Sequence, residues 1–194
     1  MHCTGILLAA GRGRRFDPSG VQNKLLQCLP SGEPVALRAA RTLAYALTET
    51  LMVLHPDAHN LQALFAQSGF VTTCCVDAGE GMGHSLAHAV RQSMHARGWI
   101  IALADMPHVQ PSTIAALDAA IRDGADIAVP VHRQRRGNPV GFSSAYRDAL
   151  LQLQGDRGAR HLLATAAVTE VAVEDAGIFL DIDLPVDLYK ILST

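Results

Sequence analysis

The sequence predicts an α/β fold: a Rossmann-like three-layer sandwich in which a mostly parallel, mixed sheet lies between two layers of helices. Short continuous apolar runs alternate along the chain with stretches whose apolar residues recur at helical spacing. This alternation is typical of strand–helix–strand units with parallel strands. No internal repeat or low-complexity linker divides the 194 residues, so we expect one domain spanning residues 1–194.

The first half of the chain is expected to alternate between strands and helices. Residues 5–10 are apolar throughout, which predicts a strand buried on both faces. Asp57 is placed to cap a helix that runs to about Gln67, and Ser85 is placed to cap the helix of residues 85–95. The other expected elements are a helix at residues 35–47 and strands at residues 50–54, 70–76 and 99–103.

The second half continues the same alternation. A helix is expected between residues 111 and 122, a strand at 127–131 and a helix at 146–153. Residues 168–173, which read VTEVAV, are expected to form a further strand. Residues 178–182 are expected to be extended, and residues 185–192 to form a short final helix.

Composition excludes several classes of protein. The formal net charge of -2 argues against a general affinity for nucleic acid. No apolar run approaches the roughly 20 residues needed to span a bilayer, and the N-terminus lacks the pattern of a signal peptide, so we expect a cytoplasmic protein. The four cysteines form no CxxC pair, which favours structural thiols in a reducing compartment over a zinc site.

The stretch after the first expected strand combines glycine with positive charge. Residues 8–24 read LAAGRGRRFDPSGVQNK. Gly11 and Gly13 allow a tight turn whose N–H groups can face an anion, and a triphosphate suits the surrounding charges of Arg12, Arg14, Arg15 and Lys24. The stretch is neither the dinucleotide fingerprint, which needs a third glycine, nor a Walker A loop.

Acidic and glycine-rich segments follow other expected strands. Asp105 comes directly after a buried strand in ALADMP, where a hard divalent cation such as Mg²⁺ would compensate its charge. Asp181 and Asp183 alternate in DIDLP, so either could face Asp105. DAGEGMGHSL supplies open backbone before a helix. Because ligands bind beyond the carboxyl ends of parallel strands, these segments together predict metal-assisted transfer involving a nucleoside triphosphate.

Six motifs, in order, resemble those of the MobA-like nucleotidyltransferases and are most similar to molybdenum cofactor cytidylyltransferase. They are LAAGRGRRF…K, EGMGHSL, LADMP, GNPVGF, GDRGARHLL and DIDLPVDL, and they extend from residue 8 to residue 188. The resemblance implies a fold of the nucleotide-diphospho-sugar transferase type. It also implies that a phosphate of molybdopterin attacks the α-phosphate of CTP with Mg²⁺ as cofactor, and that a molybdenum hydroxylase apo-enzyme is a partner.

The resemblance also assigns roles to residues of this chain. It implies catalytic roles for Arg15, Lys24 and Asp105, and magnesium ligation by Asp105 and Asp183. The implied nucleotide-binding residues are Leu8, Ala9, Ala10, Gly11, Gly13, Arg15, Lys24, Gly81, Met82 and Ser85. The implied acceptor-binding residues are Gly137, Asn138, Pro139, Arg157 and Arg160.

Three departures from the family pattern leave the substrates open, one of which is a glycine in GNPVGF where a bulkier apolar residue is frequent. Residues 17–23 lengthen the step between Arg15 and Lys24, and His84 stands where serine is frequent, near the expected base and ribose contacts. Transfer from GTP, and acceptors such as sugar phosphates or a methylerythritol phosphate, are the related alternatives. Ala9-Ala10 favours cytidylyl over guanylyl transfer, since the guanylyl loop tends to read GGxSxRMG.

Two alternatives come from other classes of protein. One is a dinucleotide-binding oxidoreductase, against which stand the missing third glycine and the lack of an acidic residue at His55-Pro56. The other is a non-catalytic chaperone for the molybdenum cofactor, which would bind the acceptor without CTP turnover. The retained Asp105 and Asp183 argue against it.

Overall fold

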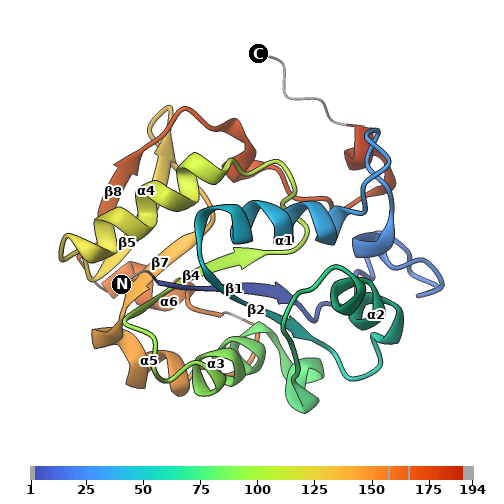
Figure 1. The fold of residues 1–194 in the computed structure, drawn as a ribbon, viewed down its shortest axis with the longest axis horizontal. Helices are drawn as coiled ribbons and strands as arrows, with labels where there is room; N and C mark the ends of the chain where they lie inside the picture. Colours follow the sequence, from blue (N-terminus) through green and yellow to red (C-terminus); the bar gives the residue numbers. More distant parts are fainter. Residues whose placement is uncertain (1–2, 157, 166, 190–194) are drawn as a thin grey trace.

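A mixed sheet of eight strands forms the centre of the protein (Figure 1). The computed structural model describes residues 3–156, 158–165 and 167–189. The strand order is β3-β2-β1-β4-β7-β5-β6, with β8 beside β5. Pairing is parallel except on both sides of β7 and between β5 and β6. The strands are β1 (Thr4–Ala9), β2 (Glu49–Leu54), β3 (Thr72–Cys74), β4 (Gly98–Leu103), β5 (Ile127–His132), β6 (Arg135–Arg136), β7 (Val140–Ser143) and β8 (Thr169–Ala172).

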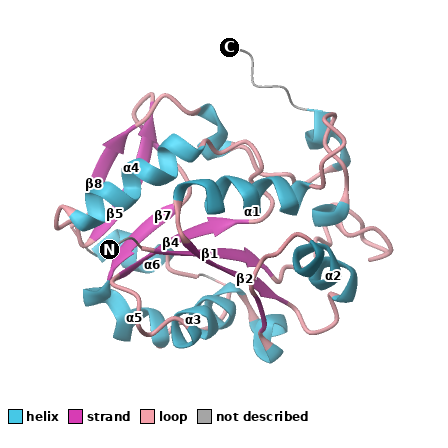
Figure 2. Ribbon diagram, viewed as in Figure 1, coloured by secondary structure: helices cyan, strands magenta, loops and turns pink. Residues whose placement is uncertain are grey.

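Helices cover both faces of this sheet, as Figure 2 shows, so the predicted three-layer α/β fold is confirmed. One layer holds α1 (Val35–Ala46), α2 (His59–Gln67) and α4 (Pro111–Arg122). The other holds α3 (Met82–Gln92), α5 (Arg147–Leu151) and α6 (Arg160–Thr165). Short 3₁₀ helices complete the chain: η1 (Lys24–Leu26), η2 (Val76–Glu80), η3 (Ser144–Tyr146), η4 (Ala176–Phe179) and η5 (Pro185–Tyr189).

Strand β1 is buried on both faces, as its apolar sequence predicts. Leu7 and Ala9 belong to the core cluster under α1 and α4, whereas Ile6 and Leu8 belong to the cluster under α3 and α5. Successive strand residues point to opposite faces, so one short run contributes to both cores. Strand β1 also pairs in parallel with β4, so the carboxyl ends of these two strands lie together at one edge of the sheet.

Both predicted helix caps are wrong. Helix α2 begins at His59 after Ala58, which makes no side-chain cap bond, and the Asp57 N–H instead donates to Nδ1 of His55 (3.1 Å). Helix α3 begins at Met82, so Ser85 lies buried inside it. Gly81 precedes the helix at φ 129°, a backbone conformation that glycine adopts readily. The helix therefore starts three residues earlier than predicted.

Several predicted elements differ from those observed in kind or length. Residues 178–182 are not extended throughout, because the chain forms η4 up to Phe179 after the Asp175 side chain accepts from the Gly177 N–H. The predicted strand 70–76 is shortened to β3 and passes into η2, and the helix 146–153 to α5. Of the predicted helix 185–192, the described part is the 3₁₀ helix η5, and the last residues lie outside the described chain.

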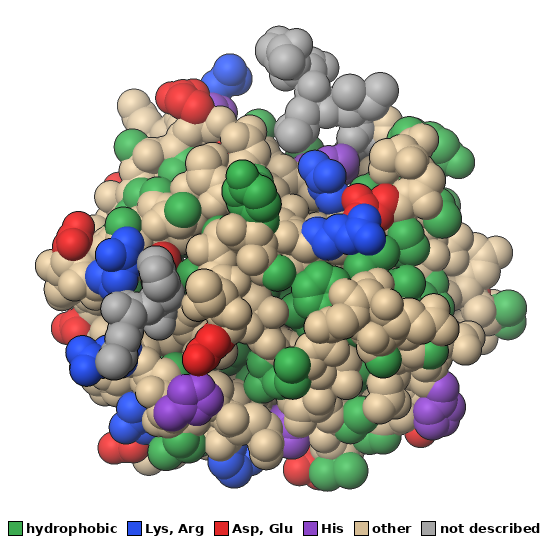
Figure 3. All heavy atoms as spheres, in the orientation of Figure 1, with side chains coloured by type: hydrophobic (Ala, Val, Ile, Leu, Met, Phe, Trp, Pro, Cys, Tyr) green, Lys and Arg blue, Asp and Glu red, His purple; other side chains and the backbone are tan. Residues whose placement is uncertain are grey.

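The surface facing the viewer in Figure 3 carries acidic and basic side chains interspersed. This distribution agrees with the near-zero net charge of the sequence. Within the described ranges, no helix is both long enough and apolar enough to cross a membrane.

The four cysteines are free thiols. Cys3 and Cys75 are buried, and burial raises the pKa of the Cys3 thiol to about 12. Cys28 is exposed, so it does not fill space in the core as a structural thiol is expected to do.

Asp175 holds the segment that leads from β8 back to the carboxyl end of β4. Its buried carboxylate accepts from the Gln110 N–H (2.8 Å), the Thr113 hydroxyl (2.7 Å) and the Gly177 N–H (2.9 Å). Six residues after η4 begins, the Ile182 N–H donates to the carbonyl oxygen of Asp105 (2.8 Å). These bonds hold the segment before Asp183 against the end of β4.

We predict that Asp175→Ala lowers the free energy of unfolding by about 3 kcal/mol, because two buried donors and one partly buried donor lose their acceptor. Urea denaturation followed by circular dichroism measures the change. The exposed Asp123 at the end of α4 provides the control, and Asp123→Ala should leave the unfolding midpoint nearly unchanged. Equal midpoints for both variants would contradict the assigned role of Asp175.

Candidate active site

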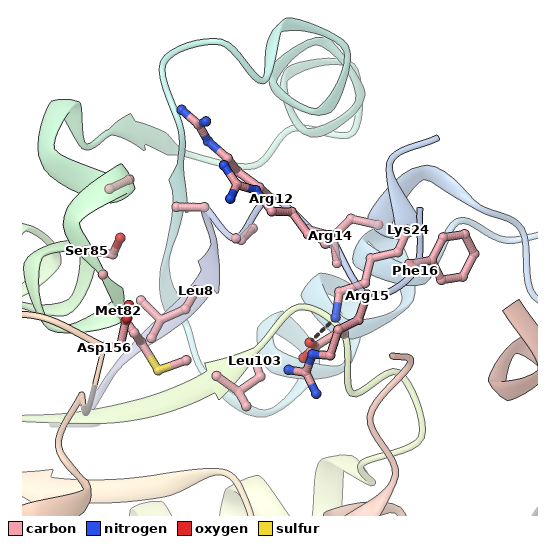
Figure 4. A pocket seen from close by; sticks show the side chains of 18 of the residues that line it. Leu8, Arg12, Arg14, Arg15, Phe16, Lys24, Met82, Ser85, Leu103 and Asp156 are labelled. Carbon is pink, nitrogen blue, oxygen red and sulfur yellow. Dashed lines mark hydrogen bonds and ion pairs between the residues drawn. The ribbon is translucent and has the colours of Figure 1, made fainter. Parts of the chain in front are cut away.

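A cavity of about 530 Å³ opens at the carboxyl ends of β1 and β4 (Figure 4). Its position agrees with the rule that ligands of parallel sheets bind at this edge. The lining residues come from the end of β1 and the loop after it, from η1, from η2 and the start of α3, from the end of β4 and the segment after it, and from the segments after α5 and η4. They are Leu8, Ala9, Ala10, Gly11, Arg12, Gly13, Arg14, Arg15, Phe16, Lys24, Leu25, Ala78, Gly79, Gly81, Met82, Ser85, Leu103, Asp105, Asp156 and Asp183.

The long segment between Arg15 and Lys24 is folded by its own side chains. The Asp17 carboxylate accepts from the hydroxyl (2.6 Å) and N–H (2.9 Å) of Ser19 and from the Gln22 N–H (2.7 Å). These bonds, the Ser19 hydroxyl foremost, hold the pKa of Asp17 below its usual range. Asn23 then caps η1 by accepting from the Leu25 N–H (2.9 Å), so Lys24 enters the cavity despite the extra length.

Lys24 is the centre of the polar end of the cavity. Its buried side chain donates from Nζ to Asp105 (2.7 Å) and to Asp183 (3.2 Å). Arg15 pairs with Asp183 from the solvent side. Burying an ammonium group is costly unless it is paired, and here two carboxylates provide the pairing. Of the two alternating aspartates, Asp183 faces the site, whereas Asp181 is exposed.

The pair Asp105 and Asp183 fits a hard divalent cation. Carboxylate oxygens are the ligands Mg²⁺ prefers, and the site already accommodates one cation, the Lys24 ammonium, between the two side chains. Within the part of the chain that the structure describes, no group of three or more His, Cys, Asp or Glu side chains could hold a metal. A divalent ion would therefore take its remaining ligands from substrate phosphates or water.

The opposite end of the cavity is built by two glycine-containing segments that pack backbone to backbone. The Gly83 N–H donates to the Gly155 carbonyl (2.8 Å). A Cβ added at Gly81 would lie 2.3 Å from the carbonyl carbon of Gly155, and one at Gly83 would lie 2.7 Å from that of Gln154. Only glycine permits this approach, which brings Asp156 beside Met82 and Ser85 (Figure 4).

Asp156 is a cavity residue that the sequence prediction missed. The motif GDRGARHLL was singled out for its arginines, and the aspartate within it was given no role. The signal was present in that motif, because Gly155 and Gly158 flank Asp156 and both adopt positive φ (63° and 52°). Glycines on both sides of a polar residue indicate a turn that exposes it.

His84 is not among the cavity-lining residues. Its Nε2 lies 3.6 Å from Oε2 of Glu80, and its Nδ1 is buried with no hydrogen-bond partner among the described residues. A direct contact between His84 and the base, which its position in the motif suggests, is therefore not supported by the geometry. Ser85, one residue later, lines the cavity instead.

The described residues among those expected to bind the acceptor lie apart from the cavity lining. Gly137, Asn138 and Pro139 join β6 to β7, and the Asn138 N–H donates to the Ile178 carbonyl (3.0 Å). Asn138 and Pro139 line a second, much smaller cavity next to Met106. Arg160 is exposed at the start of α6, and Arg157 lies outside the described residues. All residues expected to bind the nucleotide, by contrast, do line the main cavity.

Comparisons with known proteins identify relatives that span most of the chain. Residues 5–171 match the family model described as the MobA-like NTP transferase domain. The chain is 33% identical over 193 residues to the purine catabolism protein PucB of Bacillus subtilis (strain 168), covering 93% of this chain and 91% of that protein. It is 31% identical over 187 residues to a molybdenum cofactor guanylyltransferase of Burkholderia ambifaria (strain MC40-6), covering 91% and 88%.

A similar solved structure is the manganese complex of Rv0371C from Mycobacterium tuberculosis H37Rv. The two chains superpose with a TM-score of 0.79 and 26% sequence identity, over 96% of each chain. The observed fold is thus that of nucleotidyltransferases of the nucleotide-diphospho-sugar transferase type, as predicted.

We predict that Gly83→Ala separates α3 from residues 154–156 and lowers the free energy of unfolding by about 2 kcal/mol, because the added methyl group meets backbone atoms that cannot move aside. Urea denaturation measures the change. At Gly79 the nearest atom to an added Cβ is an Arg12 guanidinium nitrogen at 4.0 Å, so Gly79→Ala is the matched control. If Gly83→Ala is as stable as Gly79→Ala, then the close packing of Gly83 against Gln154 does not limit stability.

Proposed function

This chain belongs to the MobA-like NTP transferase family, and from that premise we propose that it transfers CMP from CTP to the phosphate of a molybdopterin-type acceptor, with release of pyrophosphate. The observation that carries the proposal is the Lys24 ammonium between Asp105 and Asp183, beside the arginines of the loop after β1. Such a cluster of cations and carboxylates at a sheet edge suits a triphosphate and its metal ion.

In the proposed reaction an oxygen of the acceptor phosphate bonds to the α-phosphorus of CTP. The bond from that phosphorus to the oxygen bridging to the β-phosphate breaks, and pyrophosphate leaves with the electron pair. The acceptor phosphate is already an ionised nucleophile, so no side chain has to remove a proton from it. Lys24 and Arg15 then act by aligning the phosphates and neutralising their charge, which is how catalysis of phosphoryl transfer generally works.

Asp105 and Asp183 are the residues that would hold Mg²⁺, which when bound supplies charge neutralisation at the reacting phosphates. The manganese complex of the Mycobacterium tuberculosis relative supports a divalent ion in this family. In the protein described here the same two carboxylates orient Lys24.

Guanylyl transfer from GTP is the second candidate. The relative from Burkholderia ambifaria is named a molybdenum cofactor guanylyltransferase, and it matches 91% of this chain. Ala9-Ala10 in the loop after β1 supports the cytidylyl version, which we therefore place first. We further propose a cytoplasmic location and delivery of the finished cofactor to a molybdenum hydroxylase apo-enzyme.

We predict that the purified protein, with Mg²⁺ and a molybdopterin-type acceptor, releases pyrophosphate from CTP and not from GTP, ATP or UTP. A coupled pyrophosphate assay measures the release, and omission of the acceptor is the control. Release from GTP instead would move the function to guanylyl transfer. Acceptor binding without release from any of the four nucleotides would contradict transfer and favour a cofactor chaperone.

We predict that Lys24→Ala lowers turnover by about 10²–10³-fold and that Asp105→Ala lowers it further, because each removes a preorganised charge at the reacting phosphates. The exposed Asp181 is the matched control, and Asp181→Ala should keep nearly normal turnover. Near-normal turnover of Asp105→Ala would remove the proposed metal site. Circular dichroism of each variant separates lost chemistry from lost folding.

A further inference from the structure

We propose that the Asp156 carboxylate accepts a hydrogen bond from the exocyclic amino group of the bound base, and so selects an amino-bearing nucleotide over its amino-free counterpart. The inference rests on the proposed function, since it requires a nucleoside triphosphate in the main cavity. It names Asp156 as a specificity-determining residue, a role that the sequence motifs did not assign.

The position of Asp156 is fixed by backbone contacts. The bond from the Gly83 N–H to the Gly155 carbonyl (2.8 Å) anchors the residue before Asp156 to the first turn of α3. On its other side, a Cβ at Gly158 would lie 3.2 Å from the Met82 sulfur. A carboxylate that follows an anchored backbone can recognise one ligand atom at a lower entropic cost.

Asp156 lies at the end of the cavity away from the phosphate-binding charges. Figure 4 shows Asp156, Met82 and Ser85 at one end, with Lys24 and Arg15 at the other. Asp105 and Asp183 already lie beside Lys24, and a further carboxylate there would repel a bound triphosphate, which the position of Asp156 avoids. The part of the nucleotide that reaches Asp156 is then the base.

The surroundings of Asp156 suit a base. Leu8 and Met82 contribute apolar walls, and Met82, which lines the cavity, is 45% exposed, so a flat ring can cover it. Among the described residues, none forms a hydrogen bond or ion pair with the Asp156 carboxylate. Its acceptor capacity is therefore available to a ligand.

The chemistry of a carboxylate determines which base edge it favours. An ionised carboxylate only accepts hydrogen bonds. Cytosine presents an amino donor at C4, where uracil presents a carbonyl oxygen that would repel the carboxylate. Guanine likewise presents an amino donor at C2, which hypoxanthine lacks. CTP and UTP, and GTP and inosine triphosphate, are therefore pairs of similar size that differ in the atom Asp156 would read.

The experiment measures the affinities of these four nucleotides for the full chain with Mg²⁺, by isothermal titration without acceptor. For the pair that binds, we expect the amino-bearing member to bind about 10- to 100-fold more tightly, as for a hydrogen bond to a charged group. Asp156→Asn, which can donate as well as accept, should reduce this ratio to near one. Asp123→Asn, at an exposed aspartate outside the cavity, should leave the ratio unchanged.

The other outcomes separate this inference from the proposed function. Equal affinities within both pairs, or a ratio that survives in Asp156→Asn, would overturn the base contact. An equal loss of affinity for both members would also overturn it and would indicate a sugar contact or a structural role. Selective binding without pyrophosphate release would leave the base contact intact and overturn the proposed transfer alone. Binding of none of the four nucleotides would overturn both.

Discussion

The pairing of the Lys24 ammonium with Asp105 and Asp183 is the constraint on which the rest of the site depends. It joins three segments that are far apart in the sequence: the loop after β1, the end of β4 and the chain after η4. Gly13 leaves room for it, because a Cβ there would already lie 3.3 Å from the Lys24 side chain. The Asp187 carboxylate accepts a hydrogen bond from the Asp183 N–H (2.9 Å) and so holds the backbone of Asp183 in place for this pairing.

This pairing contributes little net stability, because removing three charged groups from water costs free energy that their attraction only partly restores. Apolar side chains of similar volume often stabilise a core as well as a buried ion pair does, whereas loss of one partner leaves an uncompensated charge. A sheet edge selected only for stability would not require Lys24, Asp105 and Asp183 together. Their presence at the carboxyl ends of β1 and β4 is therefore better explained by the chemistry of a bound ligand than by folding.

Much of the fold and of the phosphate end could be predicted because local sequence determines both. The continuous apolar residues of β1 identify a strand buried on two faces, and the residues that follow it necessarily lie at the edge of the sheet. Elements that depend on distant partners were missed. The short strand β7, which contains Gly141, takes its conformation from pairing with β4 and β5. The start of α3 depends on contacts with residues 154–156.

The two ends of the candidate site also differ in whether local sequence or distant contacts determine them. The charges of Arg15 and Lys24 follow one strand directly, and any nucleoside triphosphate could use them. The end of the cavity that holds Asp156 depends on the close packing of Gly81 and Gly83 against Gln154 and Gly155, more than 70 residues later in the chain. Side chains carried by that later segment can change without disturbing the strand ends. With Asp156 as the proposed base contact, this arrangement would allow one family to keep the reaction while its members differ in the nucleotide they use, because the groups proposed to contact the base and the phosphates come from different parts of the fold.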